Sequence, residues 1–126
     1  MNTAWTLLTG RFGSDVRNPC EADLRYALEQ LFDESDSNIS RSAYETHPDA
    51  RLRWAQGAGP LFVLIVTRQR RMTFEQWANQ DLEQTIAPAH HCENIRFDDA
   101  LLFWQMLSAG DIAGLRQIFQ QHPARR

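Results

Sequence analysis

The chain has 126 residues, of which 43% are hydrophobic and 23% are charged, and its formal net charge is −3. This size and balance are typical of a folded domain, so we expect a single domain spanning residues 1–126 and exclude a disordered chain. The slight acidity argues against direct nucleic-acid binding, which usually needs a basic face, and it suits a partner with a basic surface.

The sequence shows no secretory signal and no membrane-spanning segment, so we expect a cytoplasmic protein. The first residues, MNTAWTLLTGRF, lack the basic segment and the long apolar stretch of a secretory signal. The longest apolar run, residues 60–66, is too short to cross a bilayer, so no membrane partner is expected. The cysteines, Cys20 and Cys92, have no metal-type spacing, which favours a reducing compartment.

The N-terminal part of the chain predicts a strand followed by an amphipathic helix. Residues 4–8 form the strand, and the helix runs from Pro19 to about Asp33. Asn18 is the expected cap, with Pro19 at the first helical position and Glu21 completing a box-like arrangement. The apolar residues of this helix share one stripe: Leu24, Ala27, Leu28, Leu31 and Phe32.

The middle of the chain predicts a run of short strands. Residues 39–44 are a candidate strand, and residues 51–54 alternate so that Leu52 and Trp54 share one face while both arginines occupy the other. The apolar run 61–66 predicts the buried central strand, and the alternating residues 72–77 predict its hairpin partner.

The C-terminal part predicts two helices after an irregular segment. The polar residues around Pro88 indicate a loop with at most one helical turn. A helix is expected from about Asp98 to Ala109, ended by Gly110. Asp111 then caps a last helix over residues 112–120.

This order of elements predicts an α+β fold. We expect a small antiparallel sheet of about four to five strands, with two to three helices packed on one face. The other face of the sheet is then free to remain solvated or to receive a partner.

The residues that could support catalysis or metal binding do not form a motif. The run His90-His91-Cys92-Glu93 is interpreted as a solvated loop, because adjacent residues cannot all turn toward one ion and a spaced second ligand pair is missing. Cys20 lies in the first turn of a helix, where a thiol can be activated, and a partner could come from His47, His90 or His91. Ordinary packing of Cys20 is the preferred interpretation. With no phosphate-binding glycine loop, no Gly-x-Ser-x-Gly and no His-Glu-x-x-His, we expect no enzyme, no cofactor and no metal.

A binding surface is the more attractive hypothesis. Trp77 alternates with Phe74, so the two cannot enter the same core, and a tryptophan on a sheet surface beside Glu75 is typical of an interaction hot spot. Acidic residues in or beside the loops would complement a basic protein. The predicted contact residues are Glu45, Glu75, Trp77, Asp81 and Glu83.

Several short strings in the chain resemble a known group of bacterial proteins. They are Tyr44-Glu45-x-His47-Pro48, Leu52-Arg53-Trp54, Gly59-Pro60-x-Phe62-Val63-Leu64, Phe74-Glu75-Gln76-Trp77-Ala78 with Asp81, and Asp99-Ala100-Leu101-x-x-Trp104 followed by Gly110-Asp111. The chain resembles immunity proteins of polymorphic and contact-dependent inhibition toxin systems, and the Imm1-type group is nearest.

The resemblance implies a cytoplasmic protein without enzymatic activity. Such a protein binds the C-terminal domain of one cognate toxin, commonly a nuclease or deaminase, and blocks its active site. Two alternatives stay open. One is a small α+β enzyme or ligand-binding domain that uses Cys20 and the His90-His91 loop, and the other is an adaptor subunit that uses the apolar last helices.

Overall fold

The structure is a computed structural model, and it describes residues 4–10, 15–32, 49–57, 59–80, 82 and 84–121. Its strands are β1 (Ala4–Thr9), β2 (Asp15–Arg17), β3 (Asp49–Gln56), β4 (Leu61–Thr67), β5 (Met72–Trp77) and β6 (Thr85–Cys92). Its helices are α1 (Glu21–Phe32), α3 (Phe97–Ser108) and α4 (Ile112–Gln121). The candidate strand at residues 39–44 lies outside the described residues.

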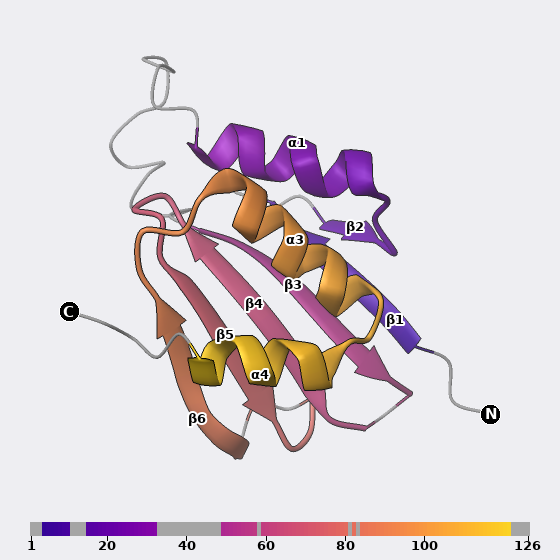
Figure 1. Cartoon of the computed structure of the whole chain (residues 1–126). Coiled ribbons are helices and arrows are strands. Elements are labelled where there is room, and N and C mark those ends of the chain that lie inside the picture. Colours follow the sequence, from indigo (N-terminus) through magenta and orange to yellow (C-terminus); the bar gives the residue numbers. More distant parts are fainter. Residues whose placement is uncertain are drawn as a thin grey trace.

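The strands form one antiparallel sheet of six strands in the order β2-β1-β3-β4-β5-β6 (Figure 1). Strands β3, β4, β5 and β6 follow one another as a meander, and β1 adds to the free side of β3. The α+β fold with an antiparallel sheet is therefore confirmed, and the sheet has one strand more than the upper bound of the prediction.

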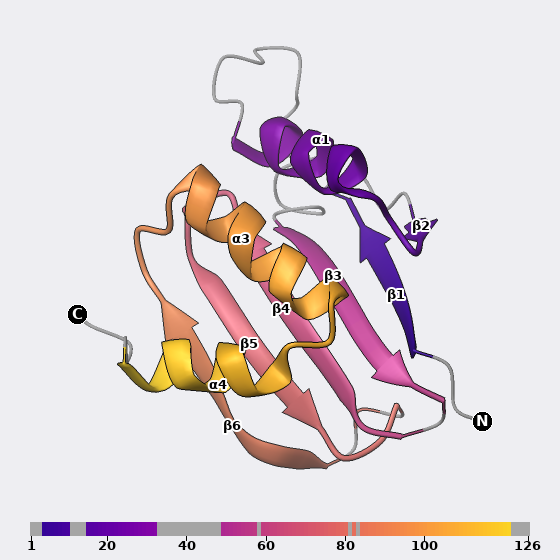
Figure 2. The same ribbon diagram turned by 45° about the vertical axis from the view of Figure 1, so that its right-hand side comes forward.

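All three described helices lie on one face of this sheet (Figures 1 and 2). The main core fills the space between them and the sheet. Leu52, Leu64 and Phe74 are neighbours across β3, β4 and β5, and each is 0% exposed. Trp104 of α3 is also 0% exposed, and its indole Nε1 donates a 3.3 Å hydrogen bond to the Leu64 carbonyl oxygen. The run 61–66 is thus a buried central strand, as predicted.

The start of α1 differs from the prediction. Asn18 has a positive φ of 50°, and its side-chain oxygen accepts a hydrogen bond from the Thr6 backbone N–H at 3.0 Å, so it fastens the chain to β1. Cys20 occupies the position before the helix instead. The carboxylate of Asp23, three residues later, accepts the Cys20 backbone N–H at 3.0 Å, as the third residue of a capping box does. The prediction of Asn18 as the cap was wrong because its side chain bonds to Thr6 of β1 instead.

The segment around Pro88 also differs, because it is a strand and not a loop. Strand β6 pairs with β5 at the edge of the sheet, with Phe74 opposite His90 and Gln76 opposite Ala87. Pro88 therefore sits at a register shift opposite Glu75, where one residue of β5 faces two of β6. An edge strand with a bulge is where a proline, which lacks a backbone N–H, can be accommodated.

The two C-terminal helices follow the prediction closely. Gly110, with a φ of 77°, ends α3, and a Cβ on it would lie 3.0 Å from the ring of Trp54. Asp111 caps α4 through a 3.0 Å hydrogen bond that its carboxylate accepts from the Gly114 backbone N–H. Leu115 and Phe119 of α4 are 0% and 1% exposed, so they face the core as expected.

Candidate functional site: the sheet face opposite the helices

The second face of the sheet carries its own small apolar cluster. Ala55, Leu61 and Val63 are at most 3% exposed and lie on the side of β3 and β4 opposite the main core. Trp5, Ile65 and Trp77 are partly buried and pack against them. No helix or strand among the described residues covers this side of the sheet (Figures 1 and 2). We call this side the open face, and its apolar centre is flanked by two tryptophans.

Trp77 and Glu75 occupy the open face as the alternation of β5 predicts. Phe74 points into the main core, while Glu75 pairs opposite Val63 and Trp77 opposite Leu61. The Trp77 indole Nε1 donates a 3.1 Å hydrogen bond to the Glu75 carboxylate. The indole ring is therefore held in one orientation, and it is partly buried against the apolar cluster. A ring positioned in advance loses little side-chain entropy when a partner covers it.

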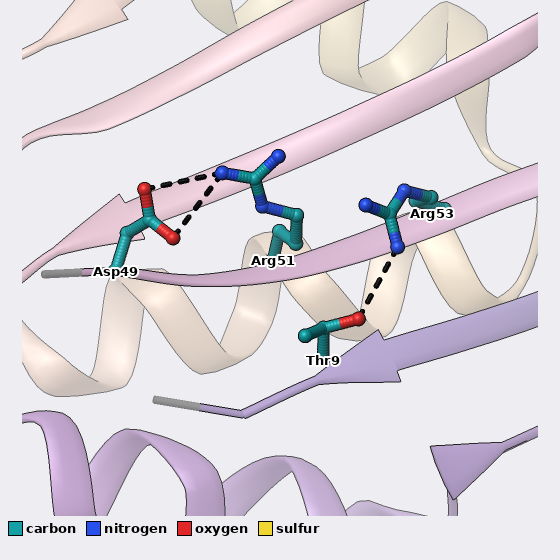
Figure 3. A network of polar contacts seen from close by, with 4 residues as sticks. All are labelled: Thr9, Asp49, Arg51 and Arg53. Carbon is teal, nitrogen blue, oxygen red and sulfur yellow. Dashed lines mark hydrogen bonds and ion pairs between the residues drawn. The ribbon is translucent and has the colours of Figure 1, made fainter. Parts of the chain in front are cut away.

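Strand β3 adds two arginines to the same face (Figure 3). The Arg51 guanidinium donates from Nη2 to both oxygens of Asp49, at 3.3 and 3.2 Å, and forms an ion pair with it. Arg53 donates from Nη1 to the Thr9 hydroxyl at 3.2 Å, and that hydroxyl donates to the Asp15 carboxylate at 2.7 Å. The hydrogen bonds from Arg53 through Thr9 to Asp15 therefore join β3, β1 and β2 across the open face.

The electrostatic environment of Arg53 is unusual for a surface arginine. Burial, and secondly the positive charge of Arg51, lower the pKa of the Arg53 guanidinium, while Asp15, Asp49 and Glu75 act in the opposite direction. A guanidinium nevertheless stays protonated in proteins. The charge of Arg53 is therefore partly desolvated, and it lies among carboxylates that are too distant to form an ion pair with it within the described part of the chain.

The predicted contact residues have different outcomes. Glu75 and Trp77 lie together on the open face. Glu45, Asp81 and Glu83 fall outside the described residues, so their place at a binding surface stays a prediction. Sequence reasoning left Trp5, Arg51 and Arg53 out of the contact set. The signal was available for the arginines, because the alternation of residues 51–54 already set them opposite Leu52 and Trp54.

The residues of the alternative hypothesis are spread over the molecule. Cys20 is exposed at the start of α1, directly after β2, whereas His90 and His91 lie on β6 at the other edge of the sheet. His91 contacts the Thr73 hydroxyl through Nδ1 at 3.0 Å on the open face, and the His90 ring lies 6.4 Å from that of Phe119 on the helix side. In the residues that the structure describes, no group of three or more His, Cys, Asp and Glu side chains is placed to hold a metal ion.

The last helices, which the adaptor hypothesis requires, pack largely on the molecule itself. Phe103 of α3 and Phe119 of α4 have ring centroids 5.8 Å apart, and Leu107 is 0% exposed. Leu102 is the large apolar residue of α3 that stays outside, with 49% exposure. One exposed leucine is ordinary for a soluble surface and does not make a patch.

Comparisons with known proteins add no family to these observations. No family model matches the chain, and no curated protein and no solved structure matches it either. Within the described ranges, no helix combines the length and apolar character needed to cross a membrane. The open face, with its two flanking tryptophans and its arginine contacts, is thus the candidate binding surface of the described chain.

Proposed function

We propose that this chain is an immunity protein that binds the C-terminal domain of a cognate bacterial toxin stoichiometrically and neutralises it through the open face of its sheet. The observation that carries the proposal is the second apolar cluster on the open face, flanked by Trp5 and Trp77. The resemblance of the sequence to toxin immunity proteins supplies the kind of partner. The toxin's chemistry is expected to be that of a nuclease or deaminase.

The composition of the open face fits a protein partner. Tryptophan and arginine are the residues most enriched at binding hot spots, and here they surround a buried apolar centre. Their side chains are already held by hydrogen bonds to Glu75 and Thr9, so little ordering is needed on binding. These features support a preorganised contact surface of mixed polarity.

The net charge of the whole chain favours a partner of opposite charge. The formal net charge of −3 favours encounter with a basic domain, and toxins that act on nucleic acid present basic clefts. Acidic residues predicted as contacts from the sequence would contribute to this attraction at the margin of the interface. Such exposed charges mainly raise the association rate, whereas the desolvated centre sets the dissociation rate.

Replacing Trp77 with alanine tests the proposal. The measurement is binding to the candidate toxin domain, to be identified among the neighbouring genes, together with growth of cells that express that toxin. Loss of a hot-spot tryptophan costs about 2 kcal/mol or more, so we expect dissociation to accelerate about 30-fold and protection to weaken.

The matched control is Leu102→Ala, which removes an exposed apolar side chain from the helix layer. It should leave binding and protection unchanged. Melting curves of both variants must show a folded protein, because Trp77 also packs on the apolar cluster. A folded Trp77→Ala variant that binds and protects like the wild type would exclude the open face as the interface.

A further inference from the structure

The two arginines of β3, Arg51 and Arg53, differ in the partner of the guanidinium group. Arg51 is neutralised by Asp49, whose two carboxylate oxygens both lie within 3.3 Å of its Nη2. Arg53 donates to an uncharged hydroxyl, that of Thr9. Among the described residues no carboxylate lies within 4.0 Å of the Arg53 guanidinium. Arg53 is therefore a cation of the open face without a counter-ion within this part of the chain, and it differs from Arg17, whose guanidinium lies over the ring of Trp5 at 5.9 Å from the ring centroid.

Arg53 is partly exposed and has N–H donors left for a partner. A guanidinium has five N–H donors in a rigid fork, and the printed contact with Thr9 uses one of them. Each nitrogen of the Arg53 guanidinium is therefore either hydrogen-bonded or not fully buried. The Thr9 hydroxyl, itself bound to Asp15, keeps Nη1 in place (Figure 3).

We infer that Arg53 is the receptor for one acidic side chain of the partner, an aspartate or glutamate that enters the centre of the open face on binding. This inference rests on the proposed function and names the chemistry that the partner must present. A carboxylate matches the fork of a guanidinium through two parallel hydrogen bonds. The pair would then be closed over the apolar cluster beside Val63, which lies opposite Arg53 on β4.

The surrounding charges favour a single carboxylate over a phosphate-bearing chain. Asp15, Asp49 and Glu75 all act on Arg53, and they would repel a polyanion such as nucleic acid. A nucleic-acid surface also needs a basic face, whereas the carboxylates of this face balance its arginines. One acidic residue in an otherwise basic toxin surface can meet Arg53 without bringing further negative charge near those carboxylates.

The test is a double-mutant cycle between Arg53 and the partner. Arg53→Gln is combined with alanine substitutions at each acidic surface residue of the candidate toxin domain, and dissociation constants are measured. Arg53→Gln alone should weaken binding about 30-fold or more, mostly through faster dissociation. At one toxin residue the two substitutions should be strongly non-additive, because each removes the same contact.

Two variants serve as controls. Arg25→Gln removes the same charge from an exposed ion pair on α1, on the helix side, and should leave the dissociation rate unchanged. Arg53→Lys keeps the charge without the fork and should recover only part of the affinity. Circular dichroism confirms that each variant is folded.

The outcomes separate this inference from the proposed function. If the wild type does not bind the toxin domain, the proposed function fails and the inference with it. If the wild type binds and Arg53→Gln is additive with every acidic substitution, the function stands and the inference is wrong. Tight binding of a duplex or single-stranded oligonucleotide that Arg53→Gln abolishes would also overturn it, in favour of a phosphate ligand.

Discussion

Replacing Leu64 with alanine measures how firmly the central strand holds the molecule together. Leu64 is 0% exposed, and its neighbours across the sheet, Leu52 and Phe74, are 0% exposed as well, as is Trp104 above it. Deleting a buried leucine costs about 2–5 kcal/mol, and the cost rises when the surroundings cannot collapse into the cavity. With strands on both sides and a helix above, we expect about 3–5 kcal/mol here.

The adjacent residue provides a matched control, because it points to the other face. Ile65 is partly exposed on the open face, so Ile65→Ala should cost about 1–2 kcal/mol. Equilibrium unfolding in urea, followed by circular dichroism and tryptophan fluorescence, gives both values. If Ile65→Ala proves as costly as Leu64→Ala, the assignment of the two faces of β4 is wrong.

Further predictions concern the cysteines and the start of α4. Burial raises the pKa of the Cys92 thiol, with Asp99 and Glu93 adding to the effect, so Cys92 holds less thiolate at a given pH. A thiol reagent at pH 8 should modify the exposed Cys20 first, and the double Cys→Ser variant should still bind the partner; equal labelling rates would contradict this. Asp111→Ala should cost about 1 kcal/mol in unfolding free energy through loss of the cap. Gly114→Ala should destabilise the wild type, because its Cβ would lie 2.5 Å from the Asp111 carboxylate, yet stabilise the Asp111→Ala variant; additive costs would refute the clash.

The parts of the fold that the sequence predicts well are those governed by local periodicity. The alternation of residues 51–54 and 72–77 assigns their two faces, and the spacing of apolar residues assigns α3 and α4. Gly110 and Asp111 are informative because they act through the backbone beside them. These signals depend on neighbours within a few residues, which is the range that a single sequence displays directly.

The features of the fold that the sequence did not predict depend on residues that are distant in the chain. Strand β6 exists because β5 offers it a sheet edge, and the bulge at Pro88 has no periodic pattern to reveal it. Asn18 loses the cap because Thr6 of β1 lies within reach of its side chain.

The candidate site was only half predictable for the same reason. Alternation placed Trp77 and the arginines on the face away from the core, but a sequence does not show that Thr9 and Asp15 hold Arg53 from two other strands. Nor does it show that Trp5 comes from β1 to the other side of the apolar cluster.

The four tryptophans give the most direct test of the open face as the binding surface. Trp5 and Trp77 lie on the open face, whereas Trp54 and Trp104 belong to the main core on the helix side. Their indole N–H signals can be followed by NMR in protein labelled with ¹⁵N-tryptophan while the proposed toxin partner is added. We expect the Trp5 and Trp77 signals to shift and those of Trp54 and Trp104 to stay in place. Shifts confined to Trp54 and Trp104, in a complex that forms, would contradict the account.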